Sequence, residues 1–575
     1  MAASATGPTA SRPWHAHYPP NVAPEVEVPP VRLPEAIRTI VERWPDRTMM
    51  IFYGARWSYR RFWEATGRFA AALARDGIGP GDRVALYLPN CPAYPIAFFG
   101  ALRRGVAVVQ VSPLYIGQDL ARLLADARPR AIVTLEILYP NLEKVASELA
   151  VPVAYVARLR ALYPWWKRPF VNRQLRRQKL STRYPAGPTI RRWSEVVRTP
   201  ASVPDATGDP AAEVAVLQYT GGTTGRPKAA MLSHRNLLAN ALQCRAWFSL
   251  DETAAPVVLC SIPFFHVYGM TVALNYPLLH GATLVLQIRP DVDEILKLID
   301  QYHPTEFPGV PTLYQGINQH PRVGDYDIRS IRICVSGSAP LPREVEKRFE
   351  ELTGGNLVEG YGLTEASPVT HANPVVGRRK TGSIGLPLPS TDQRIVDLSD
   401  RTRPAPPEMP GELEVKGPQV MLGYLGQPEE TAAVLHDGWL LTGDIATIDE
   451  EGYAFIVDRK KDMIDVAGLK VYPREVEEVL FQHPGVKDAA VIGRPNEKLG
   501  EVVHAVVILR PGVQVSEAEL IDFVRERIAH YKAPRSVEFR DTLPRSAVQK
   551  VLRRVLREEA AAGAAGARAP TAPAR

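Results

Sequence analysis

Glycine, threonine and lysine residues gather in one segment, Tyr219 to Lys228, which reads YTGGTTGRPK. Glycines let backbone N–H groups approach phosphate oxygens, threonine hydroxyls add hydrogen-bond donors, and Lys228 adds positive charge. The segment is not a Walker A loop, because that pattern needs glycine where Arg226 stands and Ser or Thr after its lysine. We predict a phosphate-binding loop made by Thr220, Gly221, Gly222, Thr223, Thr224, Gly225 and Lys228.

Two carboxylates stand in turns that also carry glycine and hydroxyl groups. Glu365 follows glycines and Thr364, where a carboxylate can hold Mg²⁺ while a threonine hydroxyl meets phosphate oxygens. Asp444 follows Thr442 and Gly443, a turn that can present a carboxylate to two neighbouring hydroxyls. Taken alone, however, Glu365 would more often be a solvated acidic residue of a loop, and Asp444 an ordinary turn residue.

The elements that must position these groups alternate between apolar strand-like runs and helical patterns, which is typical of α/β architecture. The phosphate-binding segment follows one expected strand and precedes an expected helix at 235–248. We expect strands at 84–88, 131–135, 214–219, 257–262, 283–288 and 331–335, and a further helix at 342–352.

A smaller unit follows the charged segment 459–462, which we expect to be a hinge. Its pattern predicts a helix at 473–481, strands at 488–492 and 502–509, a helix at 517–528 and a strand at 537–539. Ser516 and Glu519 form a capping box for the second helix. We expect flexible tails at 1–30 and 558–575, a nucleotide-binding domain at 31–458 and a mobile C-terminal domain at 459–557.

The motifs together resemble the signature of the adenylate-forming superfamily, which includes acyl-CoA synthetases. They occur in the family's order and extend the resemblance over about residues 35–557. They are YTGGTTGRPK at 219–228, IPFFH at 262–266, SGSAP at 336–340, EGYGLTE at 359–365, GWLLTGD at 438–444, DRKKD at 458–462 and LPRSAVQK at 543–550. The resemblance implies an α/β adenylate-forming fold with a large N-terminal domain and a small mobile α+β C-terminal domain.

The resemblance also implies roles for the nucleotide-site residues. Thr220 and Glu365 would form the metal–phosphate site, Asp444 would bind the ribose of ATP, and Arg459 would assist the nucleotide. The adenine pocket and its surroundings would be built by Gly337, Ser338, Ala339, Glu359, Gly360, Tyr361, Gly362 and Thr364.

Lys550 is the strongest catalytic candidate that the resemblance supplies. A carboxylate that attacks the α-phosphate brings two anions together, and a lysine can stabilise the charge that develops. The common pattern has glycine before this lysine, whereas Gln549 stands here. The small domain would present Lys550 for adenylation and then, by rotating about the hinge near Lys461, bring the loop with Gly468 to the thiol tunnel.

His266 lies beside Phe264 and Phe265, where a histidine is normally packed and hydrogen-bonded. The resemblance places His266 at the entrance for the carboxylate and acyl chain, so we include it among the catalytic residues as one that shapes the pocket. It is not expected to act as a general base, because a carboxylic acid is already ionised at pH 7.

Within the superfamily, segments 438–464 and 471–477 are most similar to bacterial long-chain fatty-acid–CoA ligases. This implies activation of a fatty acid with ATP and Mg²⁺ to acyl-AMP, followed by transfer to coenzyme A. Three alternatives stay open: an aryl- or medium-chain acyl-CoA ligase, a fatty-acyl-AMP ligase that uses a carrier protein, and a non-catalytic membrane- or RNA-binding relative.

The 575 residues carry 69 Lys and Arg against 62 Asp and Glu, a net charge of +7 that first suggests an acidic partner. Eleven basic and no acidic residues lie between Glu148 and Glu195, so the rest of the chain has a net charge of −4. Aromatic residues are interleaved with cations in this basic segment, 158–192. We expect peripheral contact with anionic lipid through it and no nucleic-acid binding, while a solvated basic loop is the alternative.

The chain's location and assembly follow from weaker signals. Four widely spaced cysteines favour a reducing compartment over a disulfide framework or a zinc site. The first residues lack the basic and apolar regions of a secretory signal, and prolines interrupt the most apolar stretch, 84–102. We expect a cytoplasmic protein at the inner face of the membrane, and leave a homodimer open.

Overall fold

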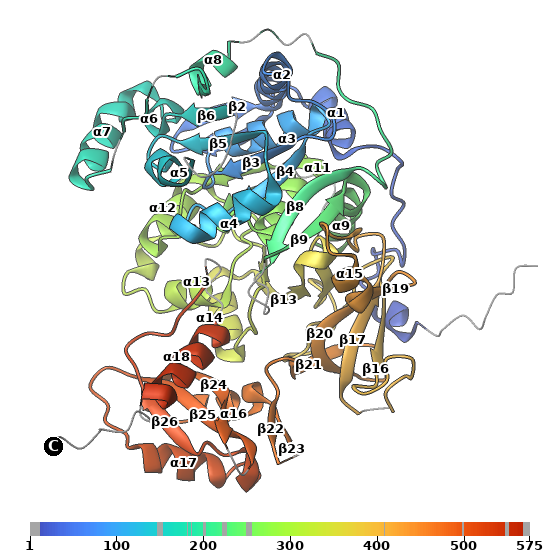
Figure 1. Ribbon diagram of the computed structural model, residues 1–575, viewed down its shortest axis with the longest axis vertical. Helices are drawn as coiled ribbons and strands as arrows, with labels where there is room; N and C mark the ends of the chain where they lie inside the picture. The colour runs from blue at the N-terminus through green and yellow to red at the C-terminus, as the bar shows by residue number, and fades with distance from the viewer. Residues whose placement is uncertain are drawn as a thin grey trace, which may run out of the picture. The chain divides into compact units, whose positions relative to one another are not determined.

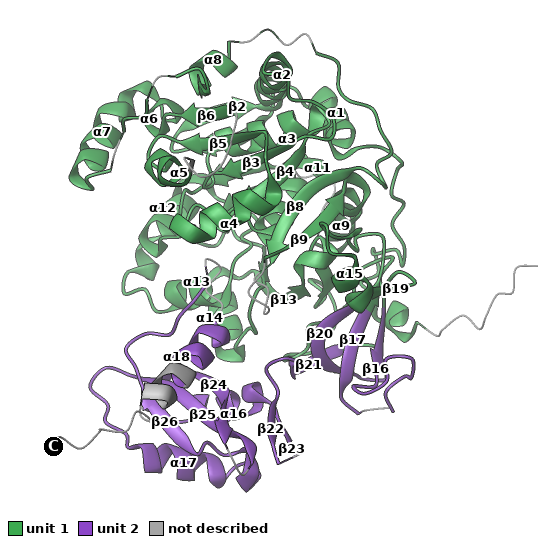
Figure 2. Ribbon diagram, viewed as in Figure 1, with its two compact units in different colours: residues 1–392, 415–440, 451–453 green, residues 393–414, 441–450, 454–575 purple. Residues whose placement is uncertain are grey.

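The computed structural model divides into two compact units (Figure 1; Figure 2). Unit 1 contains residues 1–392, 415–440 and 451–453, and unit 2 contains residues 393–414, 441–450 and 454–575. The structure describes residues 12–146, 153–180, 182–185, 187–198, 200, 203–220, 227–248, 256–406, 409–467, 469–496, 499–546 and 551–566. The expected mixed α/β fold with a larger and a smaller part is confirmed.

The largest sheet of unit 1 has eight strands in the order β18-β9-β8-β4-β3-β5-β6-β7. Strands β3 to β8 pair in parallel, while β9 pairs antiparallel with β8 and β18 antiparallel with β9. Their bounds are β3 Arg83–Tyr87, β4 Ala107–Val111, β5 Ala131–Leu135, β6 Val153–Ala157, β7 Ile190–Arg192, β8 Val214–Thr220, β9 Lys228–Ser233 and β18 Gly423–Tyr424. Most residues of the parallel strands are buried, because helices cover both faces of the sheet.

Successive side chains of a strand point to opposite faces of the sheet, and this shows which helices cover each face. Ala154 and Val156 of β6 belong to the core cluster that also contains leucines of α4 (Gly117–Ala127) and α5 (Tyr139–Ala146). Tyr155, between them, points to the other face, where its ring lies 5.3 Å from that of Phe69 in α2. Helices α1 (Leu33–Arg43), α2 (Tyr59–Arg75) and α3 (Ala93–Arg103) pack together.

Two smaller sheets complete the strand framework of unit 1. Their strand orders are β10-β11-β1-β2 and β12-β13-β14-β15. The bounds are β1 Thr48–Phe52, β2 Ala55–Ser58, β10 Val257–Cys260, β11 Thr283–Leu286, β12 Ile333–Ser336, β13 Asn356–Gly362, β14 Val369–Ala372 and β15 Leu386–Pro387. Helices α12 (Val292–Tyr302), α13 (Pro311–Asn318) and α14 (Arg343–Thr353) share an apolar core with β10 to β13.

Glu306 connects these two sheets, because it forms backbone bridges with Val258 on one side and Ile333 on the other. Its side chain is buried, and Tyr276 donates a hydrogen bond to Oε1 over 2.9 Å. Burial raises the pKa of the Glu306 carboxyl to about 7. The seam between the sheets therefore contains an acid that is half protonated near neutral pH.

Shorter helices and α9 fill the rest of unit 1. They are α6 Leu159–Leu162, α7 Arg168–Arg177, α8 Trp193–Val196, α9 His234–Phe248, α10 Val267–Met270, α11 Tyr276–Leu279 and α15 Pro428–Val434, with one-turn elements η1 Pro13–His17, η2 Trp165–Lys167, η3 Thr271–Asn275, η4 Val323–Asp325 and η5 Thr364–Ala366. Among the described residues, no helix combines the length and the apolar character that a membrane span requires.

Residues 12–30 differ from the flexible tail expected there. Trp14 is buried, and the Tyr18 hydroxyl donates to Pro387 O over 2.6 Å while its ring packs edge-on against Trp247. A proline-rich composition prevents regular structure, but two aromatic side chains are enough to dock this segment on unit 1.

Unit 2 contains most of one sheet and a compact C-terminal part. The sheet has the order β16-β17-β20-β19, and β21 pairs with β20. The bounds are β16 Asp392–Val396, β17 Gly411–Lys416, β19 Leu435–His436, β20 Trp439–Ile448 and β21 Ala454–Arg459. Unit 2 also includes residues 393–414 and 441–450, which lie before the predicted domain boundary at residue 458. The boundary of the mobile domain stays a prediction.

The C-terminal part of unit 2 packs helices on a five-stranded sheet in which β26 joins the order β23-β22-β25-β24 through β25. The bounds are β22 Ile464–Val466, β23 Leu469–Val471, α16 Pro473–Phe481, β24 Val486–Asn496, β25 Gly500–Leu509, α17 Glu517–Arg525, η6 His530–Lys532, β26 Ser536–Phe539 and α18 Arg553–Gly566. Helix α18 corrects the tail expected from residue 558. Alanine favours helix, and Leu556 and Ala560 are buried against Ile492.

Candidate active site

Thr220 and Lys228 face each other where β8 ends and β9 begins. They are direct partners in the antiparallel ladder, and Thr220 Oγ1 donates to Lys228 O over 3.4 Å. The predicted residues Gly221, Gly222, Thr223, Thr224 and Gly225 lie outside the described residues. The structure thus brings together the two described ends of the predicted phosphate-binding loop, a hydroxyl and an ammonium group.

Glu365 reaches the same part of unit 1 from η5, which packs against the strands β8 and β9. Its Oε1 accepts a hydrogen bond from the Tyr424 hydroxyl over 2.7 Å. Lys228 Nζ lies 2.6 Å from Glu430 Oε2 and 5.5 Å from the centre of the Tyr424 ring. The lysine predicted to bind phosphate and the carboxylate predicted to bind the metal therefore share one aromatic neighbour, Tyr424.

The donor set suits Mg²⁺ that arrives with a nucleotide. No group of three or more His, Cys, Asp or Glu side chains that could hold a metal ion occurs among the described residues. Mg²⁺ usually keeps several waters and binds proteins through one or two carboxylates together with substrate phosphates. Glu365, with the nearby Thr220 hydroxyl, could hold the ion in this way.

The residues predicted for adenine follow two adjacent strands. In the parallel pair of β12 and β13, Ser336 faces Glu359, and Gly337, Ser338 and Ala339 follow β12 directly. The Glu359 carboxylate accepts a hydrogen bond from Leu341 N over 3.2 Å, which fixes the turn after β12. Ser338 has a positive φ of 70°. This places the turn beside β13, which carries Gly360, Tyr361 and Gly362, with Thr364 beginning η5.

Two aromatic rings border this turn. A Cβ at Gly337 would lie 3.0 Å from the Tyr268 ring, whose hydroxyl donates to Val335 O over 2.7 Å. The Tyr361 ring is partly exposed and meets His371 edge-on at 5.9 Å. An exposed aromatic face beside backbone amides could recognise a flat base, so the adenine assignment stays a proposal.

His266 caps the short helix α10. Its Nδ1 accepts a hydrogen bond from Tyr268 N over 3.3 Å, which favours a neutral ring with its proton on Nε2. The preceding carbonyl, Phe265 O, accepts from Gln218 on β8 over 3.2 Å. His266 is thereby tied to the strand that ends at Thr220, which fits a pocket-shaping residue rather than a base.

Unit 2 contains the other nucleotide candidates. Asp444 on β20 is 5% exposed, and Arg459 on β21 lies with Nε 3.3 Å from its Oδ1. Thr442 Oγ1 accepts from Asp444 N over 3.2 Å, so the expected turn with a hydroxyl is present. The exposed Lys461 lies in the turn after β21. In the same turn, Lys460 N donates a hydrogen bond to Gly443 O over 2.9 Å.

Lys550 and Gly468 lie outside the described residues. The residues on either side of 547–550 are held together. Arg545 and Val551 form an antiparallel bridge, Leu552 N donates to Pro544 O over 2.8 Å, and the Arg545 guanidinium pairs with Asp488. The described residues 544–546 and 551–552 are therefore fixed to one another within unit 2.

Tyr424 and Glu430 are two residues at this site that the sequence reasoning missed. They lie about two hundred residues after Lys228, in the sequence YLGQPEE, where an aromatic and acidic residues follow Gly423. Only the pairing of β18 with β9 brings them to Lys228. The residue types of this segment could therefore have indicated a binding role, but its distance in sequence from Lys228 gave no sign that the residues are in contact.

Comparisons with known proteins cover nearly the whole chain. A family model described as AMP-binding enzyme matches residues 37–425, and one described as AMP-binding enzyme C-terminal domain matches residues 475–550. The long-chain-fatty-acid–CoA ligase of Bacillus subtilis (strain 168) is 44% identical over 552 residues, which are 95% of this chain and 98% of that protein. The feruloyl-CoA synthase of Amycolatopsis sp is 36% identical over 88% of this chain and 95% of that protein.

Solved structures show the same fold. The anthranilate CoA ligase AuaEII, in complex with anthranoyl-AMP, superimposes with a TM-score of 0.82 at 25% identity, covering 94% of this chain and 99% of that one. ATP-bound MatB from Rhodopseudomonas palustris superimposes with a TM-score of 0.79 at 28% identity, covering 92% and 99%. The predicted α/β adenylate-forming fold is confirmed.

Proposed function

The chain belongs to the AMP-binding enzyme family, and we propose that it activates a fatty acid with ATP and transfers the acyl group to coenzyme A. It is an acid–thiol ligase. The observation that carries this proposal is the 44% identity to a long-chain-fatty-acid–CoA ligase, sustained over 552 residues and thus through both units.

The first half-reaction joins the acid to the nucleotide. A carboxylate oxygen attacks the α-phosphorus of ATP, the bond to the β-phosphate oxygen breaks, and acyl-AMP and pyrophosphate form. Lys228 and Thr220 would hold phosphate oxygens, and Glu365 would hold Mg²⁺, whose charge partly neutralises the triphosphate. Lys550 would stabilise the charge that builds up between the two anions.

The second half-reaction moves the acyl group to sulfur. The thiol of coenzyme A attacks the acyl carbonyl carbon, the bond to AMP breaks, and the thiol proton is released. We propose that the C-terminal part rotates about residues 459–462 between the two steps, which would replace Lys550 by the loop that contains Gly468. Support comes from the pair of Asp444 and Arg459, which fixes the first residue of the proposed hinge to strand β20.

A panel of acids tests the reaction. Purified protein is incubated with ATP, Mg²⁺ and one acid, from butyrate to stearate or an aromatic acid, with and without coenzyme A. We expect AMP release with fatty acids that requires coenzyme A. Acyl-AMP formation without transfer to coenzyme A would indicate a fatty-acyl-AMP ligase, and no acid-dependent turnover would indicate a non-catalytic relative.

An aryl-CoA ligase is the second candidate, because the feruloyl-CoA synthase is 36% identical over most of this chain. The two candidate reactions share the same nucleotide chemistry and differ in the acid. Preference for benzoate or ferulate over every fatty acid in the panel would establish the aryl alternative and contradict ours.

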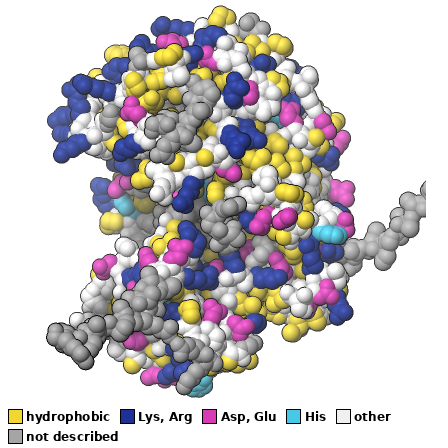
Figure 3. Space-filling model, in the orientation of Figure 1, with side chains coloured by type: hydrophobic (Ala, Val, Ile, Leu, Met, Phe, Trp, Pro, Cys, Tyr) yellow, Lys and Arg dark blue, Asp and Glu magenta, His cyan; other side chains and the backbone are white. Residues whose placement is uncertain are grey.

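We further propose that the enzyme contacts anionic membranes through its basic segment, 158–192. Helix α7 buries Val171 and Leu175 and leaves its other faces to solvent, where the charges of this segment gather (Figure 3). Trp165 is 78% and Phe170 71% exposed, which is unusual for large aromatic side chains. Trp and Arg on one surface suit the boundary between lipid headgroups and acyl chains.

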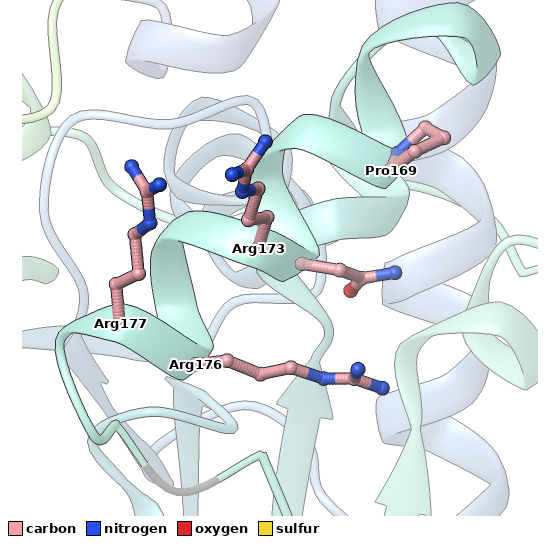
Figure 4. Close-up of a pocket in the computed structure, with 5 residues that line it drawn as sticks. Pro169, Arg173, Arg176 and Arg177 are labelled. Atoms are coloured by element: carbon pink, nitrogen blue, oxygen red, sulfur yellow. The ribbon is translucent and has the colours of Figure 1, made fainter.

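An open hollow along α7 supports the headgroup part of this proposal. It is lined by Pro169, Asn172, Arg173, Arg176 and Arg177 (Figure 4). Arg173 and Arg177 extend side by side from successive turns, so two guanidinium groups face one direction. Such an arrangement favours phosphate groups. A cytoplasmic enzyme at the inner face of the membrane would meet its fatty acid there; the homodimer stays a prediction.

A further inference from the structure

The segment from Met421 to Thr431 carries Tyr424, which contacts the proposed metal ligand Glu365, and Glu430, which contacts the proposed phosphate-binding Lys228. Its strand β18 pairs with β9, where Tyr424 faces Ala230, and Leu425 N donates to Ala229 O over 2.9 Å. At its start, Met421 N donates to Glu365 O over 2.8 Å. The segment is thus tied by its backbone to the strand that begins at Lys228 and to the element that carries Glu365.

The Tyr424 side chain is buried and hydrogen-bonded to the Glu365 carboxylate. The hydroxyl donates to Oε1 over 2.7 Å, and the tyrosine is only 7% exposed. A tyrosine hydroxyl has one hydrogen-bond donor, and Tyr424 directs it at this carboxylate. One lone pair of Oε1 is used by this bond, and the remaining carboxylate lone pairs are those that a cation could take.

Glu430 supplies a counter-ion for Lys228. The Nζ–Oε2 distance is 2.6 Å, and the lysine side chain is 16% exposed while the glutamate is 42% exposed. The lysine charge would otherwise stand next to a buried aromatic ring with little solvent. A triphosphate at this lysine would carry more negative charge than one carboxylate and would displace Glu430 or be repelled by it.

Other groups bond the backbone around these two side chains. Thr431 Oγ1 accepts from Tyr424 N over 2.9 Å and donates to Gln427 O over 2.9 Å, which fixes the turn into α15. The pairing of β18 with β9 fixes the strand. The Tyr424 hydroxyl and the Glu430 carboxylate take no part in these hydrogen bonds and contact Glu365 and Lys228 instead.

We propose that Tyr424 and Glu430 are positioning residues of the ATP site. Tyr424 holds the Glu365 carboxylate in the orientation that receives the divalent cation, and Glu430 holds Lys228 until the polyphosphate of ATP replaces it. The inference rests on the proposed function, because it assumes that Lys228 and Glu365 meet ATP and its cation.

Direct binding to the full-length protein tests this inference. ATP affinity is measured by calorimetry with Mg²⁺ and again with EDTA, and Mn²⁺ affinity of the ATP complex is measured by electron paramagnetic resonance. The variants are Tyr424→Phe and Glu430→Gln. Their controls are Tyr59→Phe, which removes a buried hydroxyl that donates to Ala282 O over 2.7 Å, and Glu429→Gln, which neutralises an exposed neighbour on α15.

Tyr424→Phe should weaken Mn²⁺ binding to the ATP complex by about tenfold, as expected for losing a hydrogen bond to a charged group, and should leave ATP affinity in EDTA within about twofold. Glu430→Gln should tighten ATP binding by about threefold at low salt, with a smaller gain at high salt. Both controls should bind as the wild type does.

A double variant separates positioning from damage to the fold. In a Glu365→Gln background, Tyr424→Phe should cause no further loss of Mn²⁺ affinity, and a full tenfold loss there would overturn its role. Mn²⁺ binding by Tyr424→Phe equal to the wild type, or ATP binding by Glu430→Gln that is unchanged or weaker, would overturn the respective assignment. A wild-type protein that binds no ATP would instead contradict the proposed function.

Discussion

Asp444 and Arg459 are direct partners across the antiparallel pair β20–β21, with the arginine Nε 3.3 Å from the aspartate Oδ1. The aspartate is nearly buried, whereas the arginine side chain remains 37% exposed. The strand pair therefore holds the Asp444 carboxylate in a fixed place, and the Arg459 guanidinium beside it can still reach a ligand.

Asp444→Asn should raise the KM for ATP by roughly tenfold, because a charged acceptor for the ribose hydroxyls becomes neutral. The change in kcat should be smaller, since the ribose takes no part in bond formation. Steady-state kinetics with a saturating fatty acid measure both constants. Asp541→Asn, at an exposed position of the same unit, is the control. A loss of kcat with unchanged KM would contradict ribose binding.

Lys550→Ala should slow acid-dependent adenylation by about 100-fold or more, while thioester formation from supplied acyl-AMP should persist. The physical reason is that only the first step brings two anions together. Pyrophosphate release measures the first step and acyl-CoA formation the second. Lys487→Ala, an exposed lysine of unit 2, should leave both unchanged. Equal losses in the two half-reactions would rule out the assigned role.

Replacing Arg173, Arg176 and Arg177 by Gln should weaken binding to vesicles rich in anionic lipid by roughly fivefold for each arginine. Trp165→Ser should weaken binding further and with less dependence on salt, because its contribution is apolar. Vesicle sedimentation at two salt concentrations measures both effects. Activity toward a short, soluble acid should not change. Wild-type protein that stays in the supernatant at low salt would contradict the lipid surface.

Glu306→Gln should alter how stability depends on pH. The folded-state pKa is raised from 4.5 to about 7, so the folded protein binds more protons than the unfolded chain between these values. The stabilising contribution of neutral Glu306 is therefore complete below about pH 4.5 and is lost as the pH rises to 7. Glutamine keeps an acceptor for Tyr276 without titrating.

As the pH rises from 4.5 to 8, the free energy of unfolding of the variant should therefore increase relative to that of the wild type by up to about 3 kcal/mol. Urea unfolding of both proteins across this range gives the difference in unfolding free energy. A difference that does not vary with pH would mean that Glu306 is ionised in the folded protein at all these values.

Local patterns predicted many of the elements well. Strand β5 and helix α16 begin and end where expected, at Ala131–Leu135 and Pro473–Phe481, because each has a clear apolar period and a proline or glycine-rich boundary. Ser516 accepts from Glu519 N over 3.2 Å, as a capping side chain should. Helix α17 ends at Arg525 instead of Ile528, which shows how weakly sequence marks a C-terminus without glycine.

The features that the sequence did not predict depend on pairing between strands that are far apart in the chain. The assignment of β16 and of parts of β17 and β20 to unit 2 depends on hydrogen bonds between strands far apart in the chain, which no local period records. The partners of Lys228 and Glu365 were missed for the same reason, since Glu430 and Tyr424 reach them only through β18. Charge composition likewise located the basic segment but could not show that Trp165 is exposed.

The closed base of the segment 547–550 has an entropic consequence. Its flanking residues are joined by the bridge between Arg545 and Val551, and Arg553 anchors the following helix to Glu477 over 2.7 Å. These contacts order Arg545, Val551 and Arg553 in the folded protein. The entropy of ordering these three residues is therefore lost on folding and is not lost again when a ligand binds.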